Sequence, residues 1–369
     1  MEWLIWLFLG VSALSWLCGW IVFGRLRGVP PLKAGEPAPR IKLSVVIPAR
    51  NEEANLRRLL PSLLQQDWAP HEIILVDDQS EDETASIAWE LGARVLLGAP
   101  VPDGWKGKPW ACAQGAKAAS GDWILFLDAD TVLEFNALRR IAALTKEPGA
   151  AHSICPYHEV EKPYEQLSAF FNVIMLVGSN AFSLKGENAK ATGLFGQALL
   201  VSRTQYDAVG GHEAVKSEVL ENFHLSRHLS SAGYACRSYL GYGLISMRMF
   251  PEGYRGLVAG WSKGFVSGAA NTARSALIWI SLWLSGLIMS VVALTFLPFV
   301  SSATGVAIGC FYGACALQCV YLFKRAGTFW IATGLLYPIG LIFYQTVFFQ
   351  ALRRVKRGGT VQWKGRDVC

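Results

Sequence analysis

The sequence of 369 residues lacks the closely spaced cysteine pairs on which small disulfide-bonded and zinc-binding domains depend. Its eight cysteines include no C-x-x-C pair, so they offer neither zinc-ligand spacing nor a disulfide framework. Three of them, Cys310, Cys315 and Cys319, lie inside one apolar segment. We interpret the cysteines as reduced thiols in a protein that faces the cytoplasm.

Charge is also scarce, because Asp, Glu, Lys and Arg make up 17% of the residues while 52% are hydrophobic. The net charge of +6 is not arranged as basic runs interleaved with aromatic residues in the polar part of the chain. We therefore expect no nucleic-acid partner. An excess of positive charge suits an anionic membrane surface better.

Two glycine-rich motifs are missing as well. No G-x-G-x-x-G follows the first predicted strand, and no G-x-x-x-x-G-K-[ST] occurs anywhere. These absences argue against a dinucleotide-dependent enzyme and against a P-loop nucleotidase.

Long uncharged runs are abundant, and the first covers residues 3–23. It is long enough to span a bilayer and is followed by Arg25 and Arg27. A signal peptide is the alternative, but no basic region precedes the run and no A-x-A site follows it. We expect a retained membrane anchor, with the residues after it on the cytoplasmic side.

Three further candidate spans lie near the other end, at 276–299, 303–323 and 328–350. If all three crossed the membrane, the basic segments 323–327 and 353–359 would lie on opposite sides. We expect the larger cluster, in the C-terminal tail, to be cytoplasmic. One segment, the Gly- and Cys-rich 303–323, is then predicted to be re-entrant or atypically packed.

The region between the spans alternates continuous apolar runs with helical periods. Such alternation predicts an α/β domain with a mostly parallel sheet covered by helices on both faces. We expect an anchor and linker at 1–40, a catalytic domain at 41–250, and an interfacial helix with membrane segments and a basic tail at 251–369.

Polar residues follow the predicted strands at the edge where ligands bind in such sheets. They are the segment 48–53, the pair Asp77 and Asp78, and the pair Asp128 and Asp130. The last two could merely end a strand in a turn. However, two acids that project the same way repel each other unless a cation lies beside them, so a hard divalent cation with phosphate ligands is the other interpretation.

Helix-capping patterns occur in the same segments. Ser80 and Glu83 have capping-box spacing, and Gly92 suits a helix C-terminal cap. Asn51 could likewise cap the first helix of the domain, which is the structural alternative to a binding role for the segment 51–53.

Four motifs occur in order: "SVVIPARNEE", "VDDQSEDET", "GKPWACAQG" and "FLDAD". Together they resemble the inverting, nucleotide-sugar-dependent glycosyltransferases of family 2, which have the GT-A fold. The resemblance covers roughly residues 41–265.

The resemblance implies a UDP-sugar donor. Asp78 would then hydrogen-bond the uracil, while Pro48 and Glu52 would line the nucleoside site. Asp128 would contact the ribose or the metal, and Asp130 would be a catalytic residue that ligates Mn²⁺ or Mg²⁺ on the diphosphate. Two further residues, Lys106 and Lys108, are candidates for phosphate contact, with solvated loop lysines as the alternative.

The acceptor side contains two amphipathic segments. At 164–184, polar residues fall on one helical stripe, which predicts a helix lying in the lipid surface; a buried core helix is the alternative. At 254–264, Trp261 with basic neighbours predicts a second interfacial helix. The Q-x-x-R-W motif of processive relatives is absent here, which disfavours a polysaccharide synthase and favours a single transfer to a lipid.

In family 2 the place matching 217–227 usually reads Glu-Asp, and the Asp is the general base. Here it reads Glu221-Asn222. An amide cannot take a proton from an acceptor hydroxyl, whereas an acceptor carboxylate is already ionised and needs no base. We therefore predict an acidic acceptor, with Glu221 retained as a catalytic residue.

The segments "CPYHEVEKPYE", "GGHEAV" and "VQWKGR" are similar to those of family members that esterify glucose onto carotenoid carboxylates. A carotenoid or another membrane lipid is thus the expected acceptor, and the enzyme is expected to be a multi-pass membrane protein with a cytoplasmic catalytic domain. Transfer to a hopanoid or a polyprenyl phosphate, or a non-catalytic membrane scaffold, are the alternatives.

Overall fold

The computed structural model describes residues 2–33, 35, 37–186, 193–218, 220–356, 362–363 and 366–367. They group into two compact units. The sheet unit comprises Arg27–Tyr157 and Ala191–Arg248, and the helical unit comprises Met1–Leu26, His158–Lys190 and Met249–Cys369. The functional division at residues 40 and 250 stays a prediction, and it did not anticipate that 158–190 packs within the helical unit.

The sheet unit is built on seven strands in the order β3-β2-β1-β4-β8-β6-β9. The strands are β1 (Leu43–Ala49), β2 (Glu72–Asp77), β3 (Arg94–Leu97), β4 (Trp123–Leu127), β6 (Ala150–Cys155), β8 (Ala198–Ser202) and β9 (Ala235–Leu240). The first four are parallel, whereas β8 runs antiparallel to both of its neighbours. The predicted mostly parallel α/β sheet is confirmed, and the reversed strand β8 was not foreseen.

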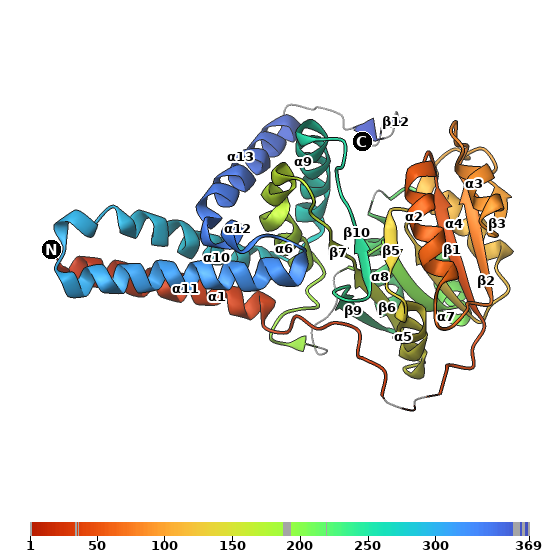
Figure 1. Cartoon of the computed structure of the whole chain (residues 1–369), viewed down its shortest axis with the longest axis horizontal. Helices are drawn as coiled ribbons and strands as arrows, with labels where there is room; N and C mark the ends of the chain where they lie inside the picture. Colours follow the sequence, from red (N-terminus) through yellow and green to blue (C-terminus); the bar gives the residue numbers. More distant parts are fainter. Residues whose placement is uncertain are drawn as a thin grey trace. The chain divides into compact units, whose positions relative to one another are not determined.

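Helices cover both faces of this sheet (Figure 1). In β4, Leu125 and Leu127 face the core under α2, α3 and α5, while Ile124 and Phe126 face the core under α4, α7 and α8. The helices are α2 (Glu53–Leu64), α3 (Thr84–Glu90), α4 (Gly107–Ala118), α5 (Ala137–Ala143), α7 (Arg203–Ala208) and α8 (Glu221–Ser231), with 3-10 turns η1 (Leu144–Lys146) and η4 (Gly211–Val215). Because every β4 side chain is buried, the acids that follow it start from a rigid strand.

The remaining strands are short. In the sheet unit, β5 (Thr131–Leu133) pairs antiparallel with β10 (Ile245–Met247). The two-residue strands are β7 (Tyr157–His158), β11 (Gln362–Trp363) and β12 (Arg366–Asp367).

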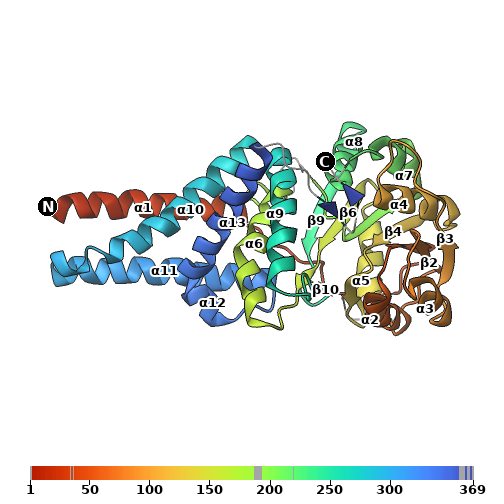
Figure 2. The same ribbon diagram turned by 90° about the horizontal axis from the view of Figure 1, so that it is seen from above.

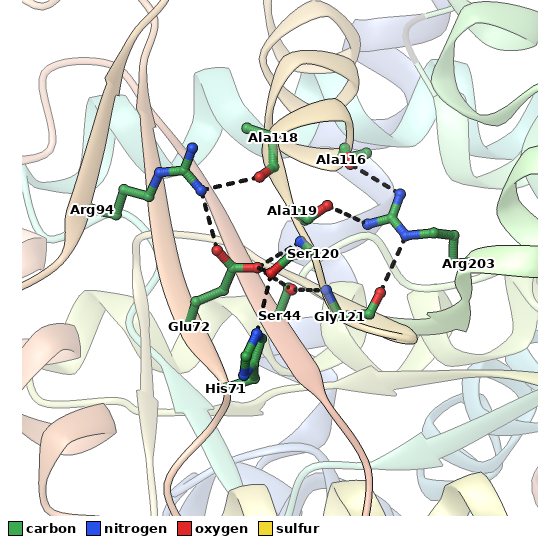
Figure 3. A network of polar contacts seen from close by, with 10 residues as sticks. All are labelled: Ser44, His71, Glu72, Arg94, Ala116, Ala118, Ala119, Ser120, Gly121 and Arg203. Atoms are coloured by element: carbon green, nitrogen blue, oxygen red, sulfur yellow. Dashed lines mark hydrogen bonds and ion pairs between the residues drawn. The ribbon is translucent and has the colours of Figure 1, made fainter.

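A polar network fixes the C-terminal end of α4 to the sheet (Figure 3). The Glu72 carboxylate accepts hydrogen bonds from Ser44 Oγ at 2.7 Å and from Ser120 N at 2.6 Å. Arg203 donates to the backbone oxygens of residues 116, 119 and 121, which are carbonyls at or just beyond the helix end. Since helix ends leave such carbonyls without helical partners, Arg203 acts as a side-chain cap that holds α4 in place.

The capping predictions had mixed outcomes. Gly92 does adopt the left-handed conformation just beyond α3, with φ +81°. The capping box is wrong, because α3 begins at Thr84 and Ser80 Oγ instead accepts from Asn51 N at 2.9 Å. Asn51 does not cap α2 either; its Oδ1 accepts from Glu81 N at 2.8 Å. These side chains join the loops after β1 and β2.

Among the residues that the structure describes, three helices of the helical unit are long and apolar enough to cross a membrane: α1 (Glu2–Phe23), α10 (Arg274–Leu294) and α11 (Ser302–Ala326). They lie side by side (Figure 2), with α10 antiparallel to α1. A Cβ on Gly286 would lie 2.4 Å from the Trp16 backbone nitrogen, so this glycine allows the two backbones to approach closely. Trp16 and Trp20 contact Phe311 and Tyr321, respectively, and α11 is therefore parallel to α1.

The predicted irregular segment was misplaced. Segment 303–323 belongs to α11, an unbroken helix of 25 residues, so a re-entrant segment there is wrong. The break falls instead in 328–350, where a short α12 (Ile331–Leu335) precedes α13 (Tyr337–Lys356). Between α10 and α11 lies the 3-10 turn η5 (Leu297–Phe299).

The predicted interfacial helix at 164–184 lies buried inside the helical unit, and Trp261 of the second predicted helix is buried too. Residues 163–178 form η2 (Pro163–Ser168) and α6 (Ala169–Gly178), and nine of the ten residues of α6 are buried. The polar stripe predicted for this segment is buried too, as expected for a core helix, which was the alternative to a helix in the lipid surface. In α9 (Tyr254–Asn271), Trp261 stacks on Phe171 at 5.0 Å and donates to Ser168 Oγ at 2.9 Å.

Candidate active site

Asp128 is held rigidly where β4 ends. Its backbone nitrogen donates to Gln197 O at 2.9 Å, and its backbone oxygen accepts from Thr131 Oγ1 at 2.8 Å. Its carboxylate forms an ion pair with Lys108, whose Nζ lies 2.6 Å from Oδ1 and 2.9 Å from Oδ2. Lys108 is the second residue of α4, so helix and strand present these side chains to each other.

Lys108 also lies 3.8 Å from Glu221 Oε1, and the two acids therefore share one ammonium. Burial alone would lower the pKa of Lys108, but the negative charges of Asp128 and Glu221 outweigh it and the pKa is raised. Burial raises the pKa of Glu221, although Lys108 opposes that shift. The cluster thus holds one fixed positive charge between carboxylates.

Asp130 lies in the turn between β4 and β5. Its Oδ1 is buried and accepts no hydrogen bond from any residue that the structure describes. Burial, together with the charges of Asp128 and Glu52, raises its pKa to about 7. A buried carboxylate oxygen without a donor, beside a second acid, fits a cation-binding position.

Among the residues that the structure describes, no three His, Cys, Asp or Glu side chains are grouped so that they could hold a metal ion. A closed metal site supplied by those side chains is therefore not present in this part of the chain. The pair Asp128 and Asp130 fits a hard cation such as Mg²⁺ or Mn²⁺, which needs one or two carboxylates and takes its other ligands from substrate phosphates and water.

The other predicted donor-site residues lie at the ends of β1 and β2. Pro48 is opposite Val76 in the parallel ladder. Asp78 is buried and its nitrogen donates to Ala49 O at 2.8 Å, which ties the two strand ends together. Glu52 precedes α2 and acts electrostatically on Asp130.

Direct contacts thus join Asp128, Lys108 and Glu221, and charge couples Glu52 to Asp130. Pro48 and Asp78 lie on the adjacent strand ends. Asp77, which was predicted at the same ligand-binding edge, accepts a hydrogen bond from Ser80 N at 3.2 Å within the loop after β2.

Sequence reasoning missed the segment just before β8. Gly196 O accepts from Lys108 at 3.5 Å, and Gln197 lies directly across the ladder from Asp128. Gln197 Oε1 is buried and has no hydrogen-bond partner in the described part of the chain. The available signal was a glycine and a polar residue immediately before the apolar run "ALLVS".

Two family models match this chain: glycosyl transferase family 2 over residues 44–189, and glycosyl transferase family group 2 over residues 123–344. The chain belongs to glycosyltransferase family 2 and is a glycosyltransferase with the GT-A fold. The acids at the end of β4 lie within both matched ranges.

Curated relatives align over the whole chain. It is 34% identical to the 4,4'-diaponeurosporenoate glycosyltransferase of Staphylococcus aureus strain MRSA252, covering 100% of this chain and 98% of the relative. Identity to the enzyme of that name from strain USA300 is 33%, with the same coverage. Among solved structures, the mannosyltransferase PcManGT of Pyrobaculum calidifontis, in complex with GDP-Man and Mn²⁺, has a TM-score of 0.54 at 16% identity and covers 94% of this chain and 95% of its own. That likeness supports the fold alone.

Proposed function

We propose that this enzyme transfers glucose from UDP-glucose, with inversion, to a membrane-soluble carboxylate of the 4,4'-diaponeurosporenoate type and so forms a glycosyl ester. The observation that carries the proposal is the acid pair Asp128 and Asp130 at a rigid strand end. It occurs in a chain that aligns from end to end with transferases named for that acceptor.

On the donor side, Asp130 and Asp128 would hold Mn²⁺ or Mg²⁺, and Asp78, Glu52 and Pro48 would bind the nucleoside. When bound, the cation supplies positive charge to the diphosphate as the glycosyl bond breaks. The unpartnered Oδ1 of Asp130 supports this assignment. Lys108 adds a second positive charge beside Asp128 and orients that carboxylate.

On the acceptor side, one oxygen of the acceptor carboxylate attacks the anomeric carbon from the face opposite the diphosphate. A carbon–oxygen bond forms, the bond to the diphosphate oxygen breaks, and its electron pair leaves with UDP. Because the acceptor is already ionised at neutral pH, no proton has to be removed. This chemistry agrees with an amide at position 222, where a general base would otherwise be expected.

The helical unit supports a membrane location. Each of α1, α10 and α11 is long enough to cross a bilayer. Arg25, Arg274 and Arg325 all lie toward one end of this bundle, because α10 starts where α1 and α11 finish. By the positive-inside rule, that end and the catalytic residues that follow α1 are cytoplasmic.

The test uses the full chain in lipid nanodiscs with labelled UDP-glucose, Mn²⁺ and either 4,4'-diaponeurosporenoate or a polyprenyl phosphate. Label in a base-labile carotenoid ester with the β-anomeric configuration supports the proposal. A parallel reaction supplies a total lipid extract in place of the single acceptors. Label that enters only the polyprenyl phosphate, or only a hopanoid of the extract, refutes the proposed acceptor. Equal transfer with UDP-galactose refutes the proposed sugar.

A further inference from the structure

The amide of Asn222 is hydrogen-bonded to the carboxylate of its neighbour Glu221. Its Nδ2 donates to Glu221 Oε1 at 2.7 Å, and both side chains are buried at the start of α8. The same Oε1 faces Lys108 at 3.8 Å. Asn222 and Lys108 therefore hold one oxygen of Glu221 from two sides.

Gly196 leaves the space that Asn222 occupies. A Cβ at position 196 would lie 2.0 Å from Asn222 Nδ2 and 3.5 Å from Glu221 Oε1. No side chain larger than hydrogen fits there while the Asn222 amide keeps its place. The contact with Glu221 thus depends on residues from two separate segments, the one before β8 and the first turn of α8.

The charge balance gives this arrangement a consequence for the acceptor. Lys108 supplies one positive charge to Asp128 and Glu221, and Asn222 adds none. An Asp at 222 would put another carboxylate within hydrogen-bond distance of Glu221 Oε1. Like charges this close repel strongly in a buried site, and they would also repel an approaching anion.

We infer that Asn222 is a positioning residue that selects an anionic acceptor, because it fixes Glu221 through Oε1 and keeps an additional negative charge out of the site. The inference rests on the proposed function and deepens it, since it names ionisation of the acceptor as the property that is recognised. A neutral hydroxyl acceptor gains nothing from the amide and lacks a base at this position.

The test compares a polyene carboxylic acid with its matching primary alcohol, using the full chain in nanodiscs. Equilibrium binding of each polyene is followed by its visible absorbance, and KM and kcat are measured with UDP-glucose. Asn222→Asp is isosteric, and Gln65→Glu is the matched control, because it makes the same amide-to-acid change on an exposed residue at the C-terminal end of α2.

In Asn222→Asp we expect KM and Kd for the acid to rise about ten-fold or more, with little change for the alcohol. Transfer to the alcohol should increase, because the new carboxylate can act as a base. Gln65→Glu should match the wild type with both acceptors. Unchanged acid binding in Asn222→Asp, or a wild type that uses the alcohol as readily as the acid, overturns the inference.

A double-mutant cycle checks the steric part. Gly196→Ala should weaken acid transfer in the wild-type background and cost much less in an Asn222→Ala background, where the overlap is gone. Equal losses in both backgrounds contradict the assigned contact. If the wild type transfers to a polyprenyl phosphate and to no carboxylate, the proposed function fails, and the phosphate is then compared with its alcohol in the same variants to judge the inference separately.

Discussion

The ion pair between Lys108 and Asp128 makes the sharpest prediction about both stability and catalysis. Replacing Lys108 by Met keeps much of the apolar stem but leaves Asp128 and Glu221 without their shared cation. Breaking a fully buried pair costs about 3–5 kcal/mol. Here the two side chains are 27% and 24% exposed, so solvent screens part of the loss and we expect ~2–3 kcal/mol.

The assay measures thermal unfolding by tryptophan fluorescence and glucosyl transfer, both with the full chain in nanodiscs. Lys108→Met should unfold at a lower temperature. It should separately lose transfer by about 10²-fold or more, because it removes a fixed positive charge from the site where negative charge develops. Lys117→Met is the control, because Lys117 is exposed on the last turn of the same helix. It should behave like the wild type.

The double variant Lys108→Met with Asp128→Asn separates the pair from general damage. It removes one of the two unpaired charges and leaves Glu221, so it should regain part of the lost stability while remaining inactive. The reasoning is refuted if Lys108→Met is as stable and active as Lys117→Met, or if the double variant is less stable than the sum of the single changes.

Three more outcomes are expected. Asp130→Ala should abolish Mn²⁺ binding, measured by electron paramagnetic resonance, and transfer, while unfolding temperature stays near the wild type; full activity in the purified variant contradicts the metal assignment. Deletion of residues 1–24 should leave the chain in the membrane fraction, because α10 and α11 remain; recovery in the soluble fraction without detergent would show otherwise. Burial lowers the pKa of His152 to about 4 and that of His212 to about 3, below the unfolded value, so both contribute stability that is present above pH ~6.5 and lost as pH falls toward the folded values. Unfolding temperature should therefore drop between pH 7 and 5, and less steeply in His152→Phe; a flat profile contradicts this.

The sheet and the edge that carries the site could be predicted because both follow from local pattern. Apolar runs such as "WILFL" are buried on both faces only in a covered sheet, and acids after them must lie at the strand ends. Asp128 and Asp130 illustrate this directly. Lys108 and Glu221 were already candidate site residues, but the ion pairs that Lys108 forms with Asp128 and Glu221 could not be predicted, because these residues are distant in sequence.

Capping patterns failed for a related reason. Ser80 and Asn51 are good capping residues in isolation, but the loops after β1 and β2 are adjacent in space. Their side chains hydrogen-bond across the two loops instead of capping the nearest helix. Tertiary proximity therefore decided between two local options that the sequence could not rank.

The prediction of a lipid-surface helix at 164–184 failed because periodicity does not identify what covers a helix face. In η2 and α6 the polar stripe is buried along with the apolar residues, and Glu165 is satisfied by the backbone nitrogens of Glu161 and Lys162. Ser168 accepts from Trp261. The polar residues of this segment form hydrogen bonds inside the helical unit, so the inference that they mark a helix at the lipid surface was wrong.

The sequence predicted that the basic segments 323–327 and 353–359 would lie on opposite sides of the membrane if 328–350 were a crossing. This conflict does not arise if 328–350, which is interrupted between α12 and α13, is not a crossing. With α1, α10 and α11 as the crossings, Glu2 and the loop before α11 share one end, where Ser301 N donates to Glu2 Oε1 at 2.7 Å. Lys324 and Arg325, in the last turn of α11, then share the other end with the residues after α1. If segment 328–350, which is divided between α12 and α13, does not cross, the tail does not have to lie opposite 323–327. Three crossings would therefore satisfy the charge rule without a re-entrant segment, which supports the orientation proposed above for the helical unit.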